Sequence, residues 1–327
     1  MTFYSFPLQD FRRKRVQVPL VILLLILLSG WTHAKEIPEG FVFEENIPYA
    51  TASERQRLDI LYPKDTDLQL PAIIHIHGGG WYTGGKGGDR TFNLLSTFAK
   101  AGYVGLSIEY RLSDEAPFPA AIEDCKEAVR WLRSHSKEYG VDPDRIGAIG
   151  ASAGGHLSAM LAVAGQEAGF DGDGTDVSSA IQAAAPVCAP LDLRAPLAPE
   201  MFEGDDPVVV RFLGGSLAEK SEEARRASPI EYVQKDLPPM LFIHGTADRR
   251  VDISQSKNMV KALEQVGAPY ETIWVEGGNH GMGIAREEPV LSQIVDFFDR
   301  ALKPKQMHQE ESNATNAETL KWWRDAK

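Results

Sequence analysis

Cysteine is scarce in this chain, whose 327 residues include only Cys125 and Cys188. Two cysteines cannot hold a fold together as the dense disulfides of small secreted domains do. No histidine stands at ligand spacing from them to complete a structural zinc site. One falls in a predicted helix and the other just after a predicted strand. This placement favours two buried thiols, with a disulfide as the alternative that export would permit.

The sequence also lacks an apolar run long enough to span a membrane. Residues 18–28 form an apolar run, about half as long as the roughly 20 residues of a spanning helix. A cationic block at residues 12–15 precedes the run and Ser29-Gly30 ends it, which is the order of a secretory signal peptide with cleavage near residues 32–34. We therefore predict that residues 1–34 are a signal peptide and that the protein is secreted or periplasmic, with no stable membrane association after cleavage. An uncleaved anchor is the alternative.

The chain has fewer basic than acidic residues. The chain has 34 Lys and Arg against 46 Asp and Glu, a formal charge of −12, and removal of residues 1–34 makes it more acidic. Such a surface repels phosphate backbones and anionic lipids, so neither nucleic acid nor a membrane surface is expected as a partner. A hydrophobic content of 43% and a charged content of 24% exclude wholesale disorder and a fibrous protein.

Short β-rich runs alternate with amphipathic helical segments along the chain. This alternation predicts an α/β fold with a mostly parallel sheet and helices on both of its faces. Strands are expected at residues 41–48, 57–62, 72–77, 104–108, 145–149, 181–185, 240–244 and 272–275.

The helices carry their own signals. Pro119 opens one, whose apolar stripe is Ile122, Cys125, Val129 and Leu132. A second begins at Asp252, with Gln255 three residues on as in a capping box, and stops at Gly267. A third starts near Pro289 and buries Leu291, Ile294, Phe298 and Leu302.

Residues 189–235 form the longest connection between predicted strands. Asp206-Pro207 and Gly214 bound one short helix in it, and another is expected around residues 222–227. A connection this long after a strand usually covers or shapes a site, so we predict a small lid insertion here. Residues 303–327 are polar and are expected to form a C-terminal tail.

The pentapeptide Gly150-Ala151-Ser152-Ala153-Gly154 fits the G-x-S-x-G pattern. It follows a predicted strand and precedes a predicted helix, so Ser152 would stand on a sharp turn between crowded backbones. A helix N-terminus behind the hydroxyl also favours developing negative charge. Ser152 is therefore our candidate nucleophile.

A serine nucleophile needs a base and an acid that orients it. His280 lies in a glycine-flanked loop just after the last predicted strand, and Asp248 follows the strand before it, so they are our candidate base and acid. Asp252 is the rival acid, although it also fits the role of a helix N-cap. His244 and His156 are expected to pack beneath the site or away from it.

The segment His77-Gly78-Gly79-Gly80-Trp81 follows the third predicted strand. Its glycines would let backbone N–H groups turn toward an oxyanion, and we assign the N–H groups of Gly79, Gly80 and Ala153 to that role. Trp81 is our candidate substrate-binding residue.

Two other patterns in this region are decoys. Gly80 to Lys86 fits part of a P-loop, but Gly87 replaces the Ser or Thr that would hold magnesium. His75 and His77 lie on one face of a strand as metal ligands would, yet no third ligand is evident. We expect no metal here.

These motifs resemble a known group of enzymes. His77-Gly78-Gly79-Gly80-Trp81 and the segment from Tyr110 to Asp124 resemble the hormone-sensitive-lipase-like esterases of the α/β-hydrolase superfamily. The run from Ser152 to Leu157 and the compact layout resemble the xylan-debranching group, the bifunctional feruloyl and acetyl esterases. The resemblance implies an eight-stranded sheet, the triad Ser152, Asp248 and His280, and no cofactor.

The resemblance has one departure. Such relatives usually carry an N-terminal helical cap, whereas residues 35–77 read as strands here. We therefore expect a catalytic domain at residues 35–302 with no N-terminal cap domain and an open site. The expected activity is hydrolysis of short-chain acyl esters, acetyl or feruloyl, of small molecules or carbohydrate. An amide hydrolase on the same triad and a non-catalytic ligand-binding scaffold are the alternatives.

Overall fold

The computed structural model of the chain describes residues 35–172, 176–194, 196–198, 205–281, 283–286 and 288–303. The predicted signal peptide, and the predicted tail beyond Lys303, lie outside these ranges, so both stay predictions. By its contacts the chain divides into Met1–Glu36 and Ile37–Lys327. Within the described ranges, none of the helices has the length and apolarity needed to cross a membrane.

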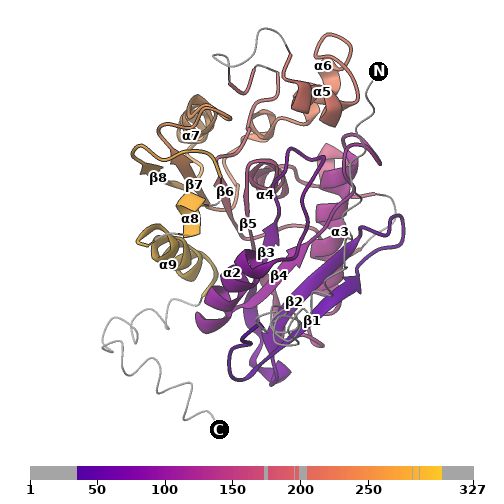
Figure 1. Cartoon of the computed structure of the whole chain (residues 1–327), viewed down its shortest axis with the longest axis vertical. Coiled ribbons are helices and arrows are strands. Elements are labelled where there is room, and N and C mark those ends of the chain that lie inside the picture. The colour runs from indigo at the N-terminus through magenta and orange to yellow at the C-terminus, as the bar shows by residue number, and fades with distance from the viewer. Residues whose placement is uncertain are drawn as a thin grey trace, which may run out of the picture. The chain divides into compact units, whose positions relative to one another are not determined.

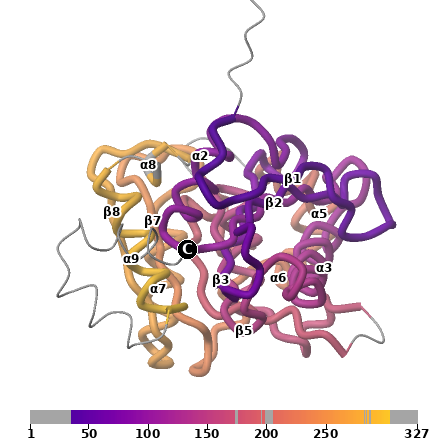
Figure 2. Tube along the Cα trace, turned by 90° about the horizontal axis from the view of Figure 1, so that it is seen from below, coloured from indigo at the N-terminus to yellow at the C-terminus, as the bar shows by residue number. Residues whose placement is uncertain are grey.

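A single eight-stranded sheet runs through the second unit in the order β1-β2-β4-β3-β5-β6-β7-β8 (Figure 1). Its first two pairings, β1 with β2 and β2 with β4, are antiparallel, and all others are parallel. Figure 2 shows β1 and β2 on one side and β8 with helix α9 (Val290–Leu302) on the other. The strands are β1 Phe41–Pro48, β2 Arg57–Pro63, β3 Leu70–Ile76, β4 Val104–Ile108, β5 Val141–Ala151, β6 Ala183–Val187, β7 Met240–Gly245 and β8 Tyr270–Val275.

All eight predicted strands are therefore confirmed, with ends that differ by a few residues. The largest difference is β5, which begins at Val141. Before β3 the described residues hold two strands and one 3-10 turn, η1 (Thr66–Leu68), but no α-helix. Between Lys35 and β3 the described chain thus holds no helical cap, and the prediction of a catalytic domain at residues 35–302 stays a prediction.

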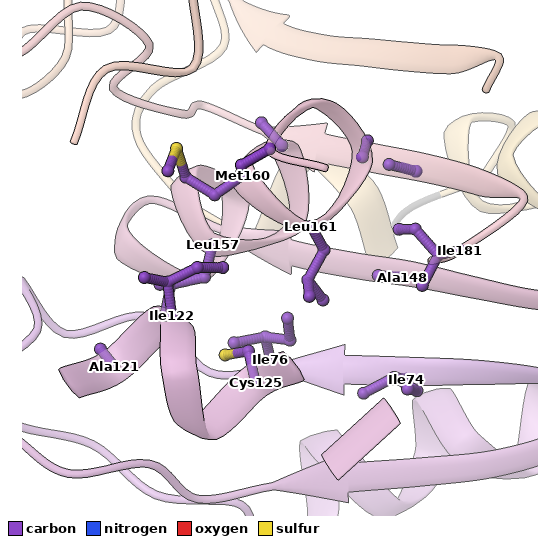
Figure 3. Packing of buried hydrophobic residues seen from close by; sticks show 14 of the residues in the cluster. Ile74, Ile76, Ala121, Ile122, Cys125, Ala148, Leu157, Met160, Leu161 and Ile181 are labelled. Carbon is purple, nitrogen blue, oxygen red and sulfur yellow. The ribbon is translucent and has the colours of Figure 1, made fainter. Parts of the chain in front are cut away.

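Helices cover both faces because neighbouring strand residues point to opposite sides. On β3, Ile73 packs with α2 (Asp89–Lys100) and α9 (Val290–Leu302). Its neighbour Ile74 belongs to a second cluster with α3 (Ala120–Ser134), α4 (Ala153–Val163) and α7 (Ser254–Val266). Figure 3 shows part of this second cluster, in which side chains of α3 and α4 meet those of β3 and β5.

The predicted apolar stripes are largely confirmed. Ile122, Cys125, Val129 and Leu132 of α3 are all fully buried, and both cysteines are buried free thiols. In α9 the buried side chains are Ile294, Phe297, Phe298 and Leu302. Leu291 is only partly buried, so its predicted burial is wrong.

The predicted start of α7 is also wrong. The helix begins at Ser254 with Ile253 as its N-cap, and Asp252 Oδ1 accepts a hydrogen bond from the Ser254 N–H at 2.8 Å. Gln255 does not complete a capping box. Its side chain instead accepts hydrogen bonds from the N–H groups of Leu191 and Asp192, both at 2.8 Å, and so anchors the connection that follows β6.

That connection contains α5 (Pro207–Leu213), α6 (Ser221–Arg226) and the 3-10 turn η3 (Pro229–Tyr232). Both predicted helices are confirmed. The Asp206 carboxylate caps α5 by accepting from the Val208 N–H at 2.8 Å, and Gly214 ends the helix in the left-handed conformation. Residues 195 and 199–204 lie outside the described ranges.

Candidate active site

Ser152 lies on a sharp turn between β5 and α4. Its φ of 57° and ψ of −121° are unusual for a residue with a side chain, and such strain persists only where the surroundings impose it. A Cβ on Gly150 would lie 2.5 Å from the Gly154 carbonyl oxygen, and a Cβ on Gly154 would overlap the Ile76 carbonyl oxygen. The two glycines of the pattern are thus needed for the turn that presents Ser152.

Asp248 and His280 meet at the same edge of the sheet. His280 Nδ1 donates a hydrogen bond to Asp248 Oδ2 at 2.7 Å. The Asp248 side chain is fully buried, whereas the His280 side chain is 23% exposed. Burial alone would raise the pKa of Asp248, but hydrogen bonds from His244 and His280 hold this pKa well below its usual range. Asp248 is therefore an anion that holds Nδ1 of a solvent-accessible imidazole.

Asp252, the rival acid, makes no such contact. Its carboxylate accepts from the Ser254 N–H, and no interaction between Asp252 and His280 occurs among the described residues. The structure therefore brings Asp248, not Asp252, to the imidazole.

The end of β6 joins the serine turn to the loop of His280. The Ser152 N–H donates to the Val187 carbonyl at 2.8 Å. The next residue, Cys188, has its thiol against the Gly281 backbone N–H and the Asp248 carboxylate. Since β5, β6, β7 and β8 are consecutive in the sheet, the carboxyl ends of these strands gather Ser152, Asp248 and His280 at one edge.

The glycine-rich loop after β3 packs directly on the serine turn. A Cβ on Gly78 would lie 2.7 Å from the Ala151 carbonyl oxygen and 3.6 Å from Ser152 Cβ. Gly79 and Gly80 have φ values of 119° and 60°, and no oxygen of the described residues accepts a hydrogen bond from the N–H of Gly79, Gly80 or Ala153. Such free donors beside a nucleophile are what an oxyanion hole requires.

Buried side chains hold this loop in shape. The His77 ring stacks on Tyr110 with centroids 4.3 Å apart, and its Nδ1 donates to the Gly78 carbonyl at 2.7 Å. The Tyr110 hydroxyl donates to the His77 carbonyl at 3.0 Å. Burial lowers the pKa of His77 to about 4, so the ring stays neutral near pH 7. Tyr110 had no predicted role in the site, because its hydrogen bond spans 33 residues.

The residues of the metal-like pattern and of the P-loop-like pattern both have structural roles. His75 Nδ1 lies 3.0 Å from the Ser107 hydroxyl in the core, so His75 and His77 do not form a metal pair. Lys86 is buried in an ion pair with Asp59 at 2.8 Å and donates to Asn46 Oδ1 at 2.8 Å. Its ammonium is therefore committed to the fold and is not available to a phosphate.

The predicted substrate-binding role of Trp81 is wrong. Its side chain is 1% exposed and stacks on Phe212 of α5 with ring centroids 4.2 Å apart. Its indole N–H donates to His156 Nδ1 at 3.1 Å. Trp81 thus fastens the glycine-rich loop after β3, which we call the oxyanion loop (residues 77–81), to α5 and α4. Val208 of α5 and Tyr82 border Gly80 instead, since both would lie within 3 Å of a Cβ placed there.

One group of described residues has metal-ligand proximity. The ligand atoms of Cys188, His244 and Asp248 all lie within 4.8 Å of one another. Both His244 nitrogens, however, are hydrogen-bonded, one to the Ser256 hydroxyl at 2.8 Å and the other to the Val251 carbonyl at 2.9 Å. Burial also raises the pKa of Cys188 to about 12. His244 and Cys188 therefore fit the role of hydrogen-bonding neighbours of Asp248 better than that of metal ligands.

Comparison with known proteins decides the family. The BD-FAE family model matches residues 58–263. The chain belongs to the BD-FAE family. Its fold and this membership confirm the predicted α/β-hydrolase fold and the resemblance to esterases of the hormone-sensitive-lipase and feruloyl esterase type.

Curated relatives and solved structures agree with this membership. The chain is 33% identical over 260 residues to esterase LipQ of Mycobacterium tuberculosis, covering 77% of this chain and 61% of the relative. It is 31% identical over 237 residues to the probable carboxylic ester hydrolase LipM of the same organism, covering 70% and 54%. The chain thus spans a little over half the length of these relatives.

Two solved structures match over more of the chain. A truncated carbohydrate esterase from gut microbiota has a TM-score of 0.72 at 31% identity, covering 80% of this chain and 97% of that one. Esterase 2 of Thermogutta terrifontis has a TM-score of 0.64 at 27% identity, covering 83% and 96%.

Proposed function

We propose that the protein is a serine carboxylic-ester hydrolase that acts through an acyl-enzyme on short-chain acyl esters of carbohydrate. The observation that carries the proposal is the 2.7 Å hydrogen bond between Asp248 and His280 at the sheet edge that also presents Ser152 on its strained turn.

The chemistry follows from the roles of these groups. Ser152 Oγ attacks the ester carbonyl carbon while His280 Nε2 takes the hydroxyl proton. The carbonyl oxygen becomes an oxyanion that accepts hydrogen bonds from the N–H groups of Gly79, Gly80 and Ala153. The carbon–oxygen bond to the alcohol then breaks, and the alcohol leaves with the proton from His280.

The second half of the reaction repeats these steps with water. His280 takes a proton from water, whose oxygen attacks the acyl carbon. Collapse of the second tetrahedral intermediate releases the acid and returns the proton to Ser152. Throughout, Asp248 holds the imidazole tautomer and stabilises its charged form without taking the proton.

The carbohydrate part of the proposal is supported by the elements that precede β3 and by a structural neighbour. The described chain has no helical cap before the oxyanion loop, which leaves room for a bulky alcohol. One matching structure, the truncated enzyme from gut microbiota, is described as a carbohydrate esterase.

A substrate panel tests the proposal. The purified protein is assayed on p-nitrophenyl acetate, butyrate and octanoate, on acetylated xylan, on methyl ferulate and on peptide p-nitroanilides, with the Ser152→Ala variant as the blank. Turnover of the short esters and of acetylated xylan or methyl ferulate is expected. Faster turnover of the anilides would favour the amide-hydrolase alternative, and no turnover of any substrate would favour the ligand-binding scaffold.

We also propose that residues 1–34 direct export. The support is the charge and apolar pattern of the sequence alone. Fractionation of cells that express the full chain, followed by N-terminal sequencing, is expected to give a periplasmic or secreted product that begins near residue 35. A membrane-bound product that retains residues 1–34 would identify an anchor instead.

A further inference from the structure

The catalytic acid is surrounded by more hydrogen-bond donors than a triad needs. We name Asp248, His244, Ser256 and Cys188 the acid cluster. Two histidines converge on one carboxylate oxygen, since His280 Nδ1 lies 2.7 Å and His244 Nε2 lies 3.3 Å from Asp248 Oδ2. The other oxygen, Oδ1, accepts from the N–H groups of Arg250 and Val251 at 2.8 and 3.0 Å. Neither oxygen is therefore free to rotate away from His280.

The partners of His244 determine where its proton sits. Its Nε2 faces two oxygens that only accept, the Val251 carbonyl at 2.9 Å and Asp248 Oδ2, so Nε2 must carry the hydrogen. In the neutral ring Nδ1 then accepts from the Ser256 hydroxyl at 2.8 Å. Ser256 is fully buried on α7, and His244 is fully buried at the end of β7. The chain Ser256–His244–Asp248–His280 thus runs from the core to the exposed imidazole.

Cys188 completes the cluster without adding charge. Burial, with a contribution from the Asp248 carboxylate, raises the pKa of this thiol to about 12. Its sulfur therefore keeps its proton near pH 7. Because the Cys188 thiol is neutral, the Asp248 carboxylate is the single negative charge of the acid cluster that faces the His280 imidazole.

From this geometry we propose that His244, held in one tautomer by Ser256, is a positioning residue that orients the Asp248 carboxylate toward His280. The inference rests on the proposed esterase function. Its physical reason is that the rate depends on how well the carboxylate holds the imidazole in the productive orientation, and a loose support for such a group costs activity. His244 acts only through Asp248.

The test uses two variants of His244 that are similar in size but differ in whether they keep an N–H donor for Asp248. His244→Leu removes the N–H, and His244→Gln places an amide N–H near the position of Nε2. We expect His244→Leu to lower kcat by about 10- to 100-fold, as for loss of a hydrogen bond to a charged group, with KM within about twofold. His244→Gln is expected to recover most of kcat.

A matched pair of serine variants separates positioning from packing. Ser256→Ala and Ser107→Ala each remove a buried hydroxyl that bonds to Nδ1 of a buried histidine, at 2.8 and 3.0 Å. Both should lower thermal stability. Only Ser256→Ala should lower kcat, by about 3- to 10-fold, because only His244 reaches the catalytic acid.

A spectroscopic readout follows the hydrogen bond itself. The far-downfield proton NMR resonance of the His280–Asp248 bond should shift or broaden in His244→Leu and return in His244→Gln. Wild-type kcat and an unchanged resonance in a folded His244→Leu variant would overturn the inference. A wild-type protein with no esterase activity would overturn the proposed function instead, so the two failures are distinguishable.

Discussion

At the scale of single residues, Ser152 illustrates how strain and reactivity coincide. Its backbone conformation, with φ at 57°, is imposed by the contacts of Gly150 and Gly154 and does not depend on the hydroxyl. Ser152→Ala should therefore fold like the wild type, with an unchanged circular dichroism spectrum, yet lose on the order of 10⁴-fold or more in kcat. Comparable turnover of p-nitrophenyl acetate by the purified variant would falsify the triad.

The two aspartates after β7 allow a sharper comparison. Asp248→Asn should lower kcat by roughly 10⁴-fold, because an amide favours the wrong imidazole tautomer. Asp252→Asn keeps an acceptor for the Ser254 N–H and should change the free energy of unfolding by less than ~1 kcal/mol, with kcat unaffected. Urea titration and steady-state kinetics on both proteins check this. Inactivity of Asp252→Asn with an active Asp248→Asn would reverse the assignment.

Two buried histidines make stability depend on pH. Burial lowers the pKa of His77 and of His156 to about 4, whereas the unfolded chain takes up these protons near pH 6.5. Between these values the unfolded state binds more protons, so the free energy of unfolding falls as the pH drops from 6.5 to 4, by up to roughly 3 kcal/mol for each histidine. Urea titrations at pH 7, 5.5 and 4.5 check this. A flat profile over that range would contradict it.

Among the elements, strands and helix stripes could be predicted from the sequence because their signals are local. All eight strands were located, since β-rich runs bounded by turns identify strands without knowledge of their neighbours. The positions of Ser152, Asp248 and His280 along the chain could be predicted for a similar reason, because each lies a few residues after the end of a strand. The predicted capping box of α7 is wrong because the Gln255 side chain contacts residues 63 and 64 positions away, and no capping rule includes so distant a partner.

Trp81 was misassigned for the same physical reason. Its neighbour Phe212 lies on α5 and its hydrogen-bond acceptor His156 lies on α4, so the loop around it is covered by elements that the local sequence does not reveal. An aromatic side chain in a glycine-rich loop looks exposed until those elements are placed. The contacts of His244 and Cys188 with Asp248 could not be predicted, because they depend on the packing of β6, β7 and α7.

The correction at Trp81 can be tested directly. Trp81→Phe keeps a ring for Phe212 but leaves buried His156 Nδ1 without its donor, which should lower the free energy of unfolding by about 1–3 kcal/mol. Because the Trp81 side chain is buried, KM should stay within about threefold of the wild type. Urea titration and initial rates on the variant provide the measurement. A large rise in KM with unchanged stability would restore Trp81 as a substrate contact.

For the whole molecule, the residues that border the glycine-rich loop bear on how an acyl chain can be enclosed. Among the described residues, the connection after β6 borders the glycine-rich loop at Gly80 through Val208 of α5. Around it lie Arg211, which sits 4.5 Å over the Tyr82 ring, and its ion-pair partner Asp114. We expect this charged pair at the border to disfavour a long apolar tunnel.

Acyl-chain preference should follow from this border. Each buried CH₂ contributes only about 0.8 kcal/mol, and does so only when it is well enclosed. We therefore expect kcat/KM to peak between acetyl and butyryl p-nitrophenyl esters and to fall sharply by octanoyl. Under the proposed function, acetylated sugars should be accepted as well. A preference for decanoyl or longer esters, with no release of acetate from acetylated carbohydrate, would show that the connection after β6 encloses an apolar channel.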